Sequence, residues 1–192
     1  TSKDAIEYIT IATTGNATDF GNLTAARNRM TACSSTTRGL LMGGASPSPA
    51  ASVEGMNNIE YVTIASVGNA TNFGDLSVTK FQNVCVSNST RGINFSGRTQ
   101  PAGNNNNVID YITIATLGNA IDFGDDSGHS PSAGVSSPTR AVSLGGRTSP
   151  ADTNIIEYVE IATTGNATDF GDLLTACNNH STGGASNGHG GL

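Results

Sequence analysis

Tryptophan is absent from this 192-residue chain, aromatic residues make up only 5 %, and charged residues make up only 12 %. Helical proteins favour Ala, Leu, Glu, Lys, Gln and Arg, whereas Gly, Thr, Ser and Asn together supply 88 residues here. β-Branched residues gather in short runs, and turn-forming residues stand between the runs. The composition therefore excludes an ordinary helical protein and predicts an all-β fold.

Basic clusters and long apolar runs are also missing. The 9 Lys and Arg residues are dispersed and the net charge is -6, so we expect neither nucleic acid nor an anionic membrane as a partner. No apolar run approaches the roughly 20 residues that cross a bilayer, so we expect no membrane span.

What the chain does contain is a repeat. The run IEYITIATTGNATDFGNL begins at Ile6 and returns in similar form at Ile59, Ile109 and Ile156, at spacings of 53, 50 and 47 residues. A fixed period of this length is typical of stacked repeat architectures. Residues 1–192 are therefore predicted to form a single array of four units, of which the last is degenerate.

Each unit predicts four short strands. The first is a brief apolar run such as Gly39–Gly43 or Ala141–Gly145, and the second is the Ile-x-Tyr-x-x-Ile-Ala run, which a Gly-Asn turn ends. The third passes through Phe20, Phe73, Phe123 or Phe170 and ends at the following glycine. The fourth lies near Met30–Cys33, Asn83–Val86, Ala133–Val135 and Thr175–Cys177.

A small antiparallel sheet that repeats every ~50 residues is what a β-propeller blade requires. A β-solenoid-like array is the alternative, because it also stacks equivalent residues. If four blades close a ring, the tail at Gly183–Gly191 would pair with the opening blade. Otherwise the chain is part of a longer array that further blades or partner subunits complete.

The order of residues resembles kelch-like propeller repeats, in which a Gly-Gly pair ends one strand and a Tyr lies in the next. Gly43-Gly44 precedes Tyr61 and Gly145-Gly146 precedes Tyr158 in this way, although the kelch Trp is missing. The whole unit, with a stretch such as Cys33-Ser-Ser-Thr-Thr-Arg38-Gly after it, also resembles repeats in tail-fibre and other virion proteins of marine cyanophages. That resemblance implies a virion or extracellular location and a structural or adhesive role.

Several residues are of types that act in catalysis or metal binding in other proteins. Asp-Phe-Gly occurs at Asp19, Asp122 and Asp169, but the other parts of a kinase site are absent, so a turn-capping role is expected. Acidic residues beside it, such as Asp125, Asp126 and Asp172, match no calcium loop. His129, His180 and His189 lack zinc-ligand spacing and are expected to be solvated. We therefore predict no enzyme, no catalytic residue, no cofactor and no metal site.

Cysteine and arginine recur at repeat positions. Cys33, Cys85 and Cys177 are expected to be equivalent, small buried residues, too far apart in neighbouring units to form a disulfide. Arg38, Arg91 and Arg140 either form an anion-binding ring or pair with acids such as Asp19, Asp75 or Asp122 of the same or the adjacent unit. The second role is favoured, because repeats reuse their contacts.

The units differ most at Ala45–Asn58, Arg98–Asn107, Ser127–Pro138 and Arg147–Asn154, where loops rich in Asn, Ser, Pro and Gly are expected on one rim. The favoured function is a non-enzymatic phage virion module, such as a tail fibre, that presents these loops to a host-surface receptor or glycan. The alternative is a structural repeat protein that assembles with itself or with other virion proteins into a fibre or shell decoration. A polysaccharide-acting propeller enzyme is a third hypothesis.

Overall fold

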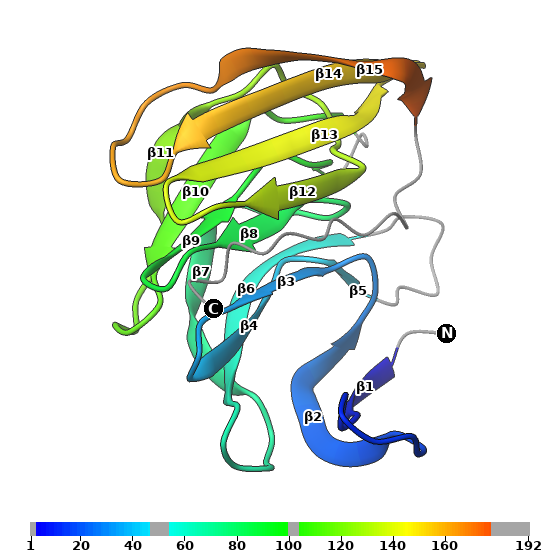
Figure 1. Ribbon diagram of the computed structural model, residues 1–192, viewed down its shortest axis with the longest axis vertical. Coiled ribbons are helices and arrows are strands. Elements are labelled where there is room, and N and C mark those ends of the chain that lie inside the picture. The colour runs from blue at the N-terminus through cyan, green and yellow to red at the C-terminus, as the bar shows by residue number, and fades with distance from the viewer. Residues whose placement is uncertain (1–2, 47–53, 100–103, 178–192) are drawn as a thin grey trace.

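The computed structural model describes residues 3–46, 54–99 and 104–177 (Figure 1). Within these ranges the chain forms β-strands and no helix, so the prediction of an all-β protein is confirmed. It follows that no helix in these ranges is long and apolar enough to cross a membrane. The strands are β1 (Lys3–Tyr8), β2 (Thr18–Arg27), β3 (Thr31–Ser34), β4 (Arg38–Met42), β5 (Ala45–Ser46), β6 (Glu54–Thr63), β7 (Thr71–Lys80), β8 (Cys85–Ser87), β9 (Arg91–Asn94), β10 (Val108–Thr113), β11 (Ile121–Asp125), β12 (Ala133–Ser136), β13 (Arg140–Thr148), β14 (Ala151–Glu160) and β15 (Thr168–Cys177).

The strands form four antiparallel sheets that follow the order of the chain. The first sheet holds β1 and β2, the second β3 to β7, the third β8 to β11 and the fourth β12 to β15. In the second sheet β4 and β5 pair with the same edge of β6, on either side of Gly43-Gly44, while β7 occupies the other edge. No sheet closes on itself in the described part of the chain.

The sheets lie one after another along an arc, with β3, β8 and β12 on its inner side (Figure 1). The first sheet stands at one end of the arc and the fourth at the other. The same strand register recurs in all four sheets, since the Ile of each Ile-x-Tyr run faces a glycine of the next strand. The pairs are Ile6 with Gly21, Ile59 with Gly74, Ile109 with Gly124 and Ile156 with Gly171.

Two predicted strand positions are wrong. The glycine after each Phe does not end its strand, because Gly21, Gly74 and Gly171 lie inside ten-residue strands, next to an irregularity in the pairing. Thr175–Cys177 is not an inner strand either. It is the end of β15, where Cys177 faces Thr153.

The apolar core lies between sheets rather than within one. One cluster joins the second and third sheets and includes Leu40, Met42 and Phe73 against Ile112 and Ile114. The equivalent cluster of the next interface joins the third and fourth sheets through Ile93, Phe95, Phe123, Val159 and Ile161. Because burial of apolar area is the main stabilising term in folding, each sheet depends on its neighbour for stability.

Candidate functional site

The contact between neighbouring sheets repeats in detail. The Gly-Asn-Ala turn of the second sheet lies against the outer strand of the first, where Gly68 N donates to Phe20 O at 2.7 Å and Ala70 N donates to Asn22 O at 2.8 Å. Asn69 Oδ1 accepts from Asn22 N at 2.9 Å. The same three bonds recur at the next two interfaces, from Gly118, Asn119 and Ala120 to Phe73 and Asp75, and from Gly165, Asn166 and Ala167 to Phe123 and Asp125.

The glycine inside the outer strand makes this approach possible. A Cβ atom on Gly21 would lie 2.3 Å from Gly68 O, one on Gly74 2.2 Å from Gly118 O, and one on Gly124 2.4 Å from Gly165 O. The φ of Gly74 is +156°, which also favours glycine. The recurring glycine therefore serves the inter-sheet contact, which explains why it interrupts each strand without ending it.

A stacked Arg-Tyr-Phe group reinforces the two interfaces that join the second, third and fourth sheets. The guanidinium of Arg38 lies 4.7 Å from the ring centre of Tyr61, which packs edge-on against Phe73. Arg38 Nη1 donates to Ile114 O of the third sheet at 2.7 Å. Arg91 repeats this arrangement over Tyr111, with bonds of 2.8 and 3.1 Å to Ile161 O and Ala162 O of the fourth sheet.

The acidic partners predicted for Arg38 and Arg91 are wrong, whereas the predicted pairing with an acid of the same unit is confirmed for Arg140, which meets Glu160. Arg38 and Arg91 bind backbone carbonyls of the following sheet, so they do join neighbouring units, but not through Asp19, Asp75 or Asp122. Arg140 of the fourth sheet stacks on Tyr158 at 4.5 Å and pairs with the exposed Glu160 at 2.7 Å. This pair raises the pKa of Arg140 through a hydrogen bond and the charge of Glu160. Among the described residues, no sheet follows the one to which Arg140 belongs.

Buried ion pairs form a second repeated contact. Arg27 Nη2 of the first sheet lies 3.1 Å from Glu60 Oε2 of the second, and Lys80 Nζ of the second lies 2.8 Å from Asp110 Oδ2 of the third. All four side chains are buried. Burial lowers the pKa of both Arg27 and Lys80, against the opposing effect of the neighbouring carboxylate. Removal of one partner from such a pair would leave a buried charge without compensation.

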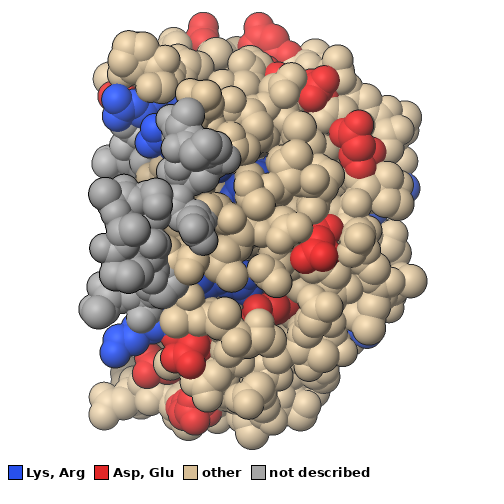
Figure 2. Space-filling model, turned by 180° about the vertical axis from the view of Figure 1, so that it is seen from behind, with Lys and Arg blue, Asp and Glu red and all other residues tan. Residues whose placement is uncertain are grey.

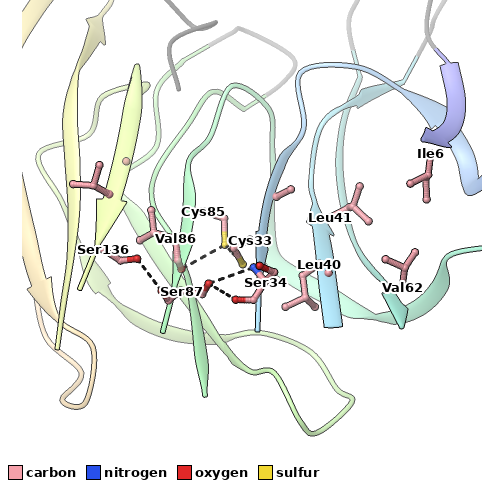
Figure 3. Close-up of a pocket in the computed structure, with 14 residues that line it drawn as sticks. Ile6, Cys33, Ser34, Leu40, Leu41, Val62, Cys85, Val86, Ser87 and Ser136 are labelled. Atoms are coloured by element: carbon pink, nitrogen blue, oxygen red, sulfur yellow. Dashed lines mark hydrogen bonds between the residues drawn. The ribbon is translucent and has the colours of Figure 1, made fainter. Parts of the chain in front are cut away.

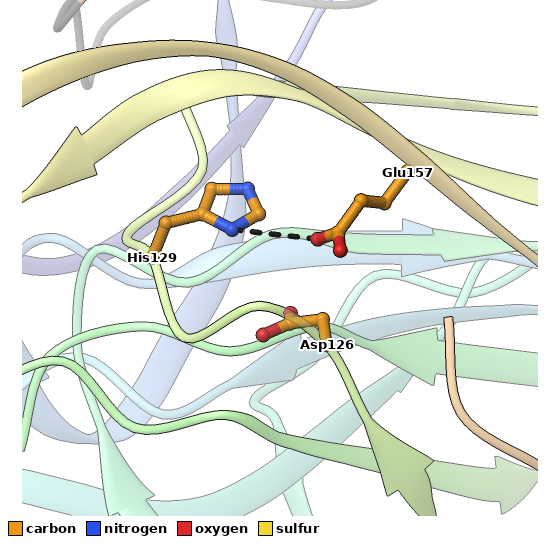
Figure 4. A group of neighbouring side chains, drawn as sticks. All are labelled: Asp126, His129 and Glu157. Carbon is orange, nitrogen blue, oxygen red and sulfur yellow. Dashed lines mark ion pairs between the residues drawn. The ribbon is translucent and has the colours of Figure 1, made fainter. Parts of the chain in front are cut away.

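At the third interface, between the third and fourth sheets, His129 takes the place that Arg27 and Lys80 have at the other two interfaces (Figure 4). His129 is fully buried, so the prediction that it is solvated is wrong. Its Nδ1 lies 3.6 Å from Glu157 Oε2. One ring nitrogen of His129 and one carboxylate oxygen each of Asp126 and Glu157, the atoms that could bind a metal ion, all lie within 4.8 Å of one another. His180 and His189 lie outside the described residues.

The carboxylates of this group already accept hydrogen bonds from the protein. Asp126 Oδ1 accepts from Gly128 N at 2.8 Å, and its Oδ2 accepts from Ser96 N at 3.3 Å. Glu157 Oε2 accepts from Ser127 N and Oγ at 3.3 and 3.0 Å. The group is the spatial equivalent of the Arg27–Glu60 contact, in which Thr24 donates to Glu60 from the same two atoms. Its geometry fits a polar contact between sheets.

Burial of His129 and burial of Asp126 make stability depend on pH in opposite directions. It lowers the pKa of His129 to about 4, so the folded state resists protonation of the imidazole and loses stability as pH falls from 6.5 to 4. Burial also raises the pKa of Asp126 to about 7, against hydrogen bonds from Ser96 and Gly128. The folded state therefore loses stability as pH rises from 3.8 to 7. The two effects oppose each other between pH 4 and 6.5.

The predicted hydrogen bond between the Asp carboxylate of Asp-Phe-Gly and a nearby backbone N–H is present in two units, at an irregularity within a strand and not in a turn. Asp122 Oδ1 accepts from Gly124 N at 3.1 Å, and Asp169 Oδ1 accepts from Gly171 N at 3.0 Å. Asp125 N and Asp75 N are engaged with asparagine side chains of the following sheet. Asp75 and Asp125 therefore take part in the contacts between neighbouring sheets.

The fourth sheet is the last in the described part of the chain, and no described residue covers its contact surface at Gly171. No described atom lies within 4 Å of a Cβ built on Gly171, although this glycine shares the sequence context and positive φ of Gly74. Phe170 is 56 % exposed, whereas its equivalents Phe73 and Phe123 are each 3 % exposed. Leu174, four residues later in β15, is also fully exposed.

The first sheet ends the arc in the complementary way. It has equivalents of β6 and β7 but, among the described residues, none of β3 and β4. Ile9 and Ile11 are 63 % and 95 % exposed, while Ile112 and Ile114, which hold the same places in the third sheet, are buried. The Gly15–Ala17 turn is exposed as well. This end therefore presents the partner features of the surface around Gly171.

A pocket of about 510 Å³ lies among the inner strands β3, β8 and β12 (Figure 3). Equivalent serines line it and connect the strands, since Ser87 Oγ donates to Ser34 O at 2.7 Å and Ser136 Oγ donates to Ser87 O at 2.8 Å. Ile6, Leu41 and Val86 supply apolar lining. The pocket is thus mainly apolar with a row of serines, and every sheet contributes to it.

The predicted variable loops are only partly loops. Ser127–Pro138 contains strand β12, and His129 and Ser130 within it are buried. In Arg147–Asn154 the strands β13 and β14 continue almost to the turn. Parts of Ala45–Asn58 and Arg98–Asn107 lie outside the described residues. In the described part of the face that Figure 2 shows, acidic side chains are scattered among uncharged ones.

No model of a known protein family and no curated protein matches the sequence. Among the solved structures that are similar in fold is one titled "Structure of YjhT", with a TM-score of 0.70 at 9 % sequence identity. The match covers 83 % of this chain and 56 % of that chain, so the chain spans little more than half the length of the solved protein. At this identity the likeness concerns the fold alone. The resemblance to kelch and cyanophage virion repeats stays a prediction.

Proposed function

We propose that the chain is a non-enzymatic structural module, an open arc of a β-propeller-type array that assembles through its two end sheets with further copies. The observation that carries the proposal is the uncovered Gly171. At three interfaces the same glycine makes room for the turn of a following sheet, and the fourth glycine has the same form with no described turn against it.

Exposed apolar side chains support the same function. Phe170 at one end is exposed, whereas its equivalents Phe73 and Phe123 are buried. Ile9 and Ile11 at the other end are exposed, whereas Ile112 and Ile114 of the third sheet are buried. A contiguous exposed apolar surface is typical of an interaction site. Pairing of one end with the other is a head-to-tail contact, which builds a ring if the rotation closes and a fibre if it does not.

One position makes the end contact weaker than the internal ones. Glu7 corresponds to Glu60 and Asp110, which meet the buried cations Arg27 and Lys80. In the fourth sheet Cys177 occupies the register position of those cations. A second copy would therefore bring Glu7 against a site without a positive charge, which costs free energy. We therefore expect the association between the end sheets of two copies to be reversible.

The virion location and host attachment belong to this proposal on the strength of the sequence resemblance. The pocket among β3, β8 and β12 favours attachment to a polar ligand as a second function, because serine hydroxyls and apolar side chains line it together. A glycan-array screen of the chain tests that function, and a screen without any bound glycan counts against it.

Light scattering over a concentration series, combined with small-angle X-ray scattering, tests the assembly. We expect the mean mass to rise above that of one chain as concentration increases. Phe170→Ser should reduce this rise, whereas Ile121→Ser should not, because Ile121 is equally exposed at 57 % but lies within the arc. A monomeric wild type at every concentration, or equal effects of the two substitutions, would overturn the proposal.

A further inference from the structure

Two cysteine side chains meet between the inner strands of the second and third sheets (Figure 3). Cys33 lies in β3 and Cys85 in β8, and their Sγ atoms are 2.7 Å apart. Nonbonded carbon atoms rest at about 3.5 to 4 Å, and sulfur is larger than carbon. A disulfide bond has an S–S length of about 2.05 Å. The expectation that these cysteines lie too far apart to bridge is therefore wrong.

Hydrogen bonds on both sides hold the two strands in this register. Cys85 N donates to Thr31 Oγ1 at 2.8 Å, and Ser87 Oγ donates to Ser34 O at 2.7 Å. The thiols lie between these two contacts, so the sheets need no rearrangement to bring the sulfur atoms together.

We propose that Cys33 and Cys85 are a disulfide-forming pair, which covalently joins the second and third sheets when the chain meets a small-molecule disulfide such as glutathione disulfide. The pair is independent of the end surfaces, so this inference does not rest on the proposed assembly.

The surroundings determine which thiol reacts first. Cys33 is half-buried and lines the 510 Å³ pocket, through which a small oxidant can reach it. Cys85 is buried, and burial together with the Cys33 thiol raises the pKa of Cys85. Because the thiolate is the reactive form, Cys33 attacks the reagent and Cys85 resolves the product.

The exchange is balanced. The Cys33 thiolate attacks one sulfur of the reagent, the S–S bond of the reagent breaks, and one reagent thiolate leaves. Cys85 then loses its proton and attacks the Cys33 sulfur, so the second reagent thiolate leaves. Two protein thiols are oxidised, and one reagent disulfide is reduced to two thiols.

Cys177 serves as an internal reference. It lies at the end of β15, where Gly145 and Leu173 are its neighbours, and no other cysteine is close to it among the described residues. Its thiol should therefore stay free or carry one glutathione.

Peptide mapping of the full chain after treatment with glutathione disulfide tests the proposal. Trypsin cleavage after Arg29 and Arg38 releases Cys33 in peptide 30–38, and cleavage after Lys80 and Arg91 releases Cys85 in peptide 81–91. We expect a linked pair of these peptides, lighter by about 2 Da than the sum of the two thiol forms, which dithiothreitol separates.

The wild-type map decides the question without any variant. Recovery of Cys33 and Cys85 as separate thiols or separate glutathione adducts would overturn the proposal, as would a link from either residue to Cys177. Cys177→Ser is the matched control and should form the same linked pair. The oxidised chain should also melt higher, by on the order of 10 °C for a loop of this length, and Cys33→Ser should show no such oxidant-dependent shift.

Discussion

Two glycines in equivalent places allow the inter-sheet contact to be measured directly. Gly74 and Gly171 both follow Phe, face the Ile of an Ile-x-Tyr run and have φ values of +156° and +139°. They differ in surroundings, since a Cβ on Gly74 would lie 2.2 Å from Gly118 O while no described atom lies near one on Gly171. Substitution by alanine strains both backbones, by about 1 to 3 kcal/mol each. The difference between the two variants therefore isolates the contact.

The magnitude follows from the bonds that the new methyl group displaces. Gly118 O must retreat by roughly 1 Å to reach ordinary contact distance, which breaks the bonds from Gly118 N to Phe73 O and from Ala120 N to Asp75 O, now 2.9 and 2.8 Å. The bond from Asp75 N to Asn119 Oδ1 at 3.1 Å is lost with them. At about 1 kcal/mol for each bond, Gly74→Ala should cost about 3 kcal/mol more than Gly171→Ala.

Thermal unfolding of both variants by circular dichroism measures this difference. For a chain of this size we expect Gly74→Ala to melt about 6 to 12 °C below Gly171→Ala. The melting curves are recorded at low protein concentration, because association between the end sheets of two copies would otherwise contribute to the stability of Gly171→Ala. Equal melting temperatures under these conditions would refute the reasoning, because they would show that the turn does not rest on the glycine.

Two further predictions concern the side chains between sheets. Arg91→Ala should cost about 2 kcal/mol of unfolding free energy, because it removes a charged hydrogen bond and a stacked ring contact. Arg140→Ala should cost much less, because solvent screens its pair with Glu160; equal losses in urea titrations would contradict this. Between pH 4 and 6.5, Asp126→Asn should gain stability relative to the wild type as pH rises, while His129→Gln should lose it, each by up to about 3 kcal/mol. Urea midpoints across this pH range that run parallel to the wild type would count against the two shifted pKa values.

The sequence predicted the strands well and their contacts poorly. The period of the repeat and the alternation of apolar residues located every inner strand except that at Thr175–Cys177, because both depend on local pattern. The role of Gly74 could not be predicted, since the atom that excludes a side chain there belongs to Gly118, 44 residues later. The burial of His129 was missed for a related reason. A polar, glycine-containing stretch normally indicates a solvated loop, and only the folded arrangement places the acid of the next sheet against it.

The cysteines show where alignment of the repeats by residue identity gives the wrong equivalence. Thr-Ala-Cys occurs at Cys33 and again at Cys177, and the shared letters suggested equivalent strands. The hydrogen-bond register instead aligns Cys177 with Arg27 and Lys80, because each faces a residue near the start of the preceding long strand. This alignment changes the interpretation of the last unit. The surface of the fourth sheet keeps Gly171 and Phe170, which would receive a following sheet. It has Cys177 where a cation would neutralise the acidic residue of that following sheet. A sheet with an uncharged residue at that position would pair with it more tightly than the first sheet of a second copy does.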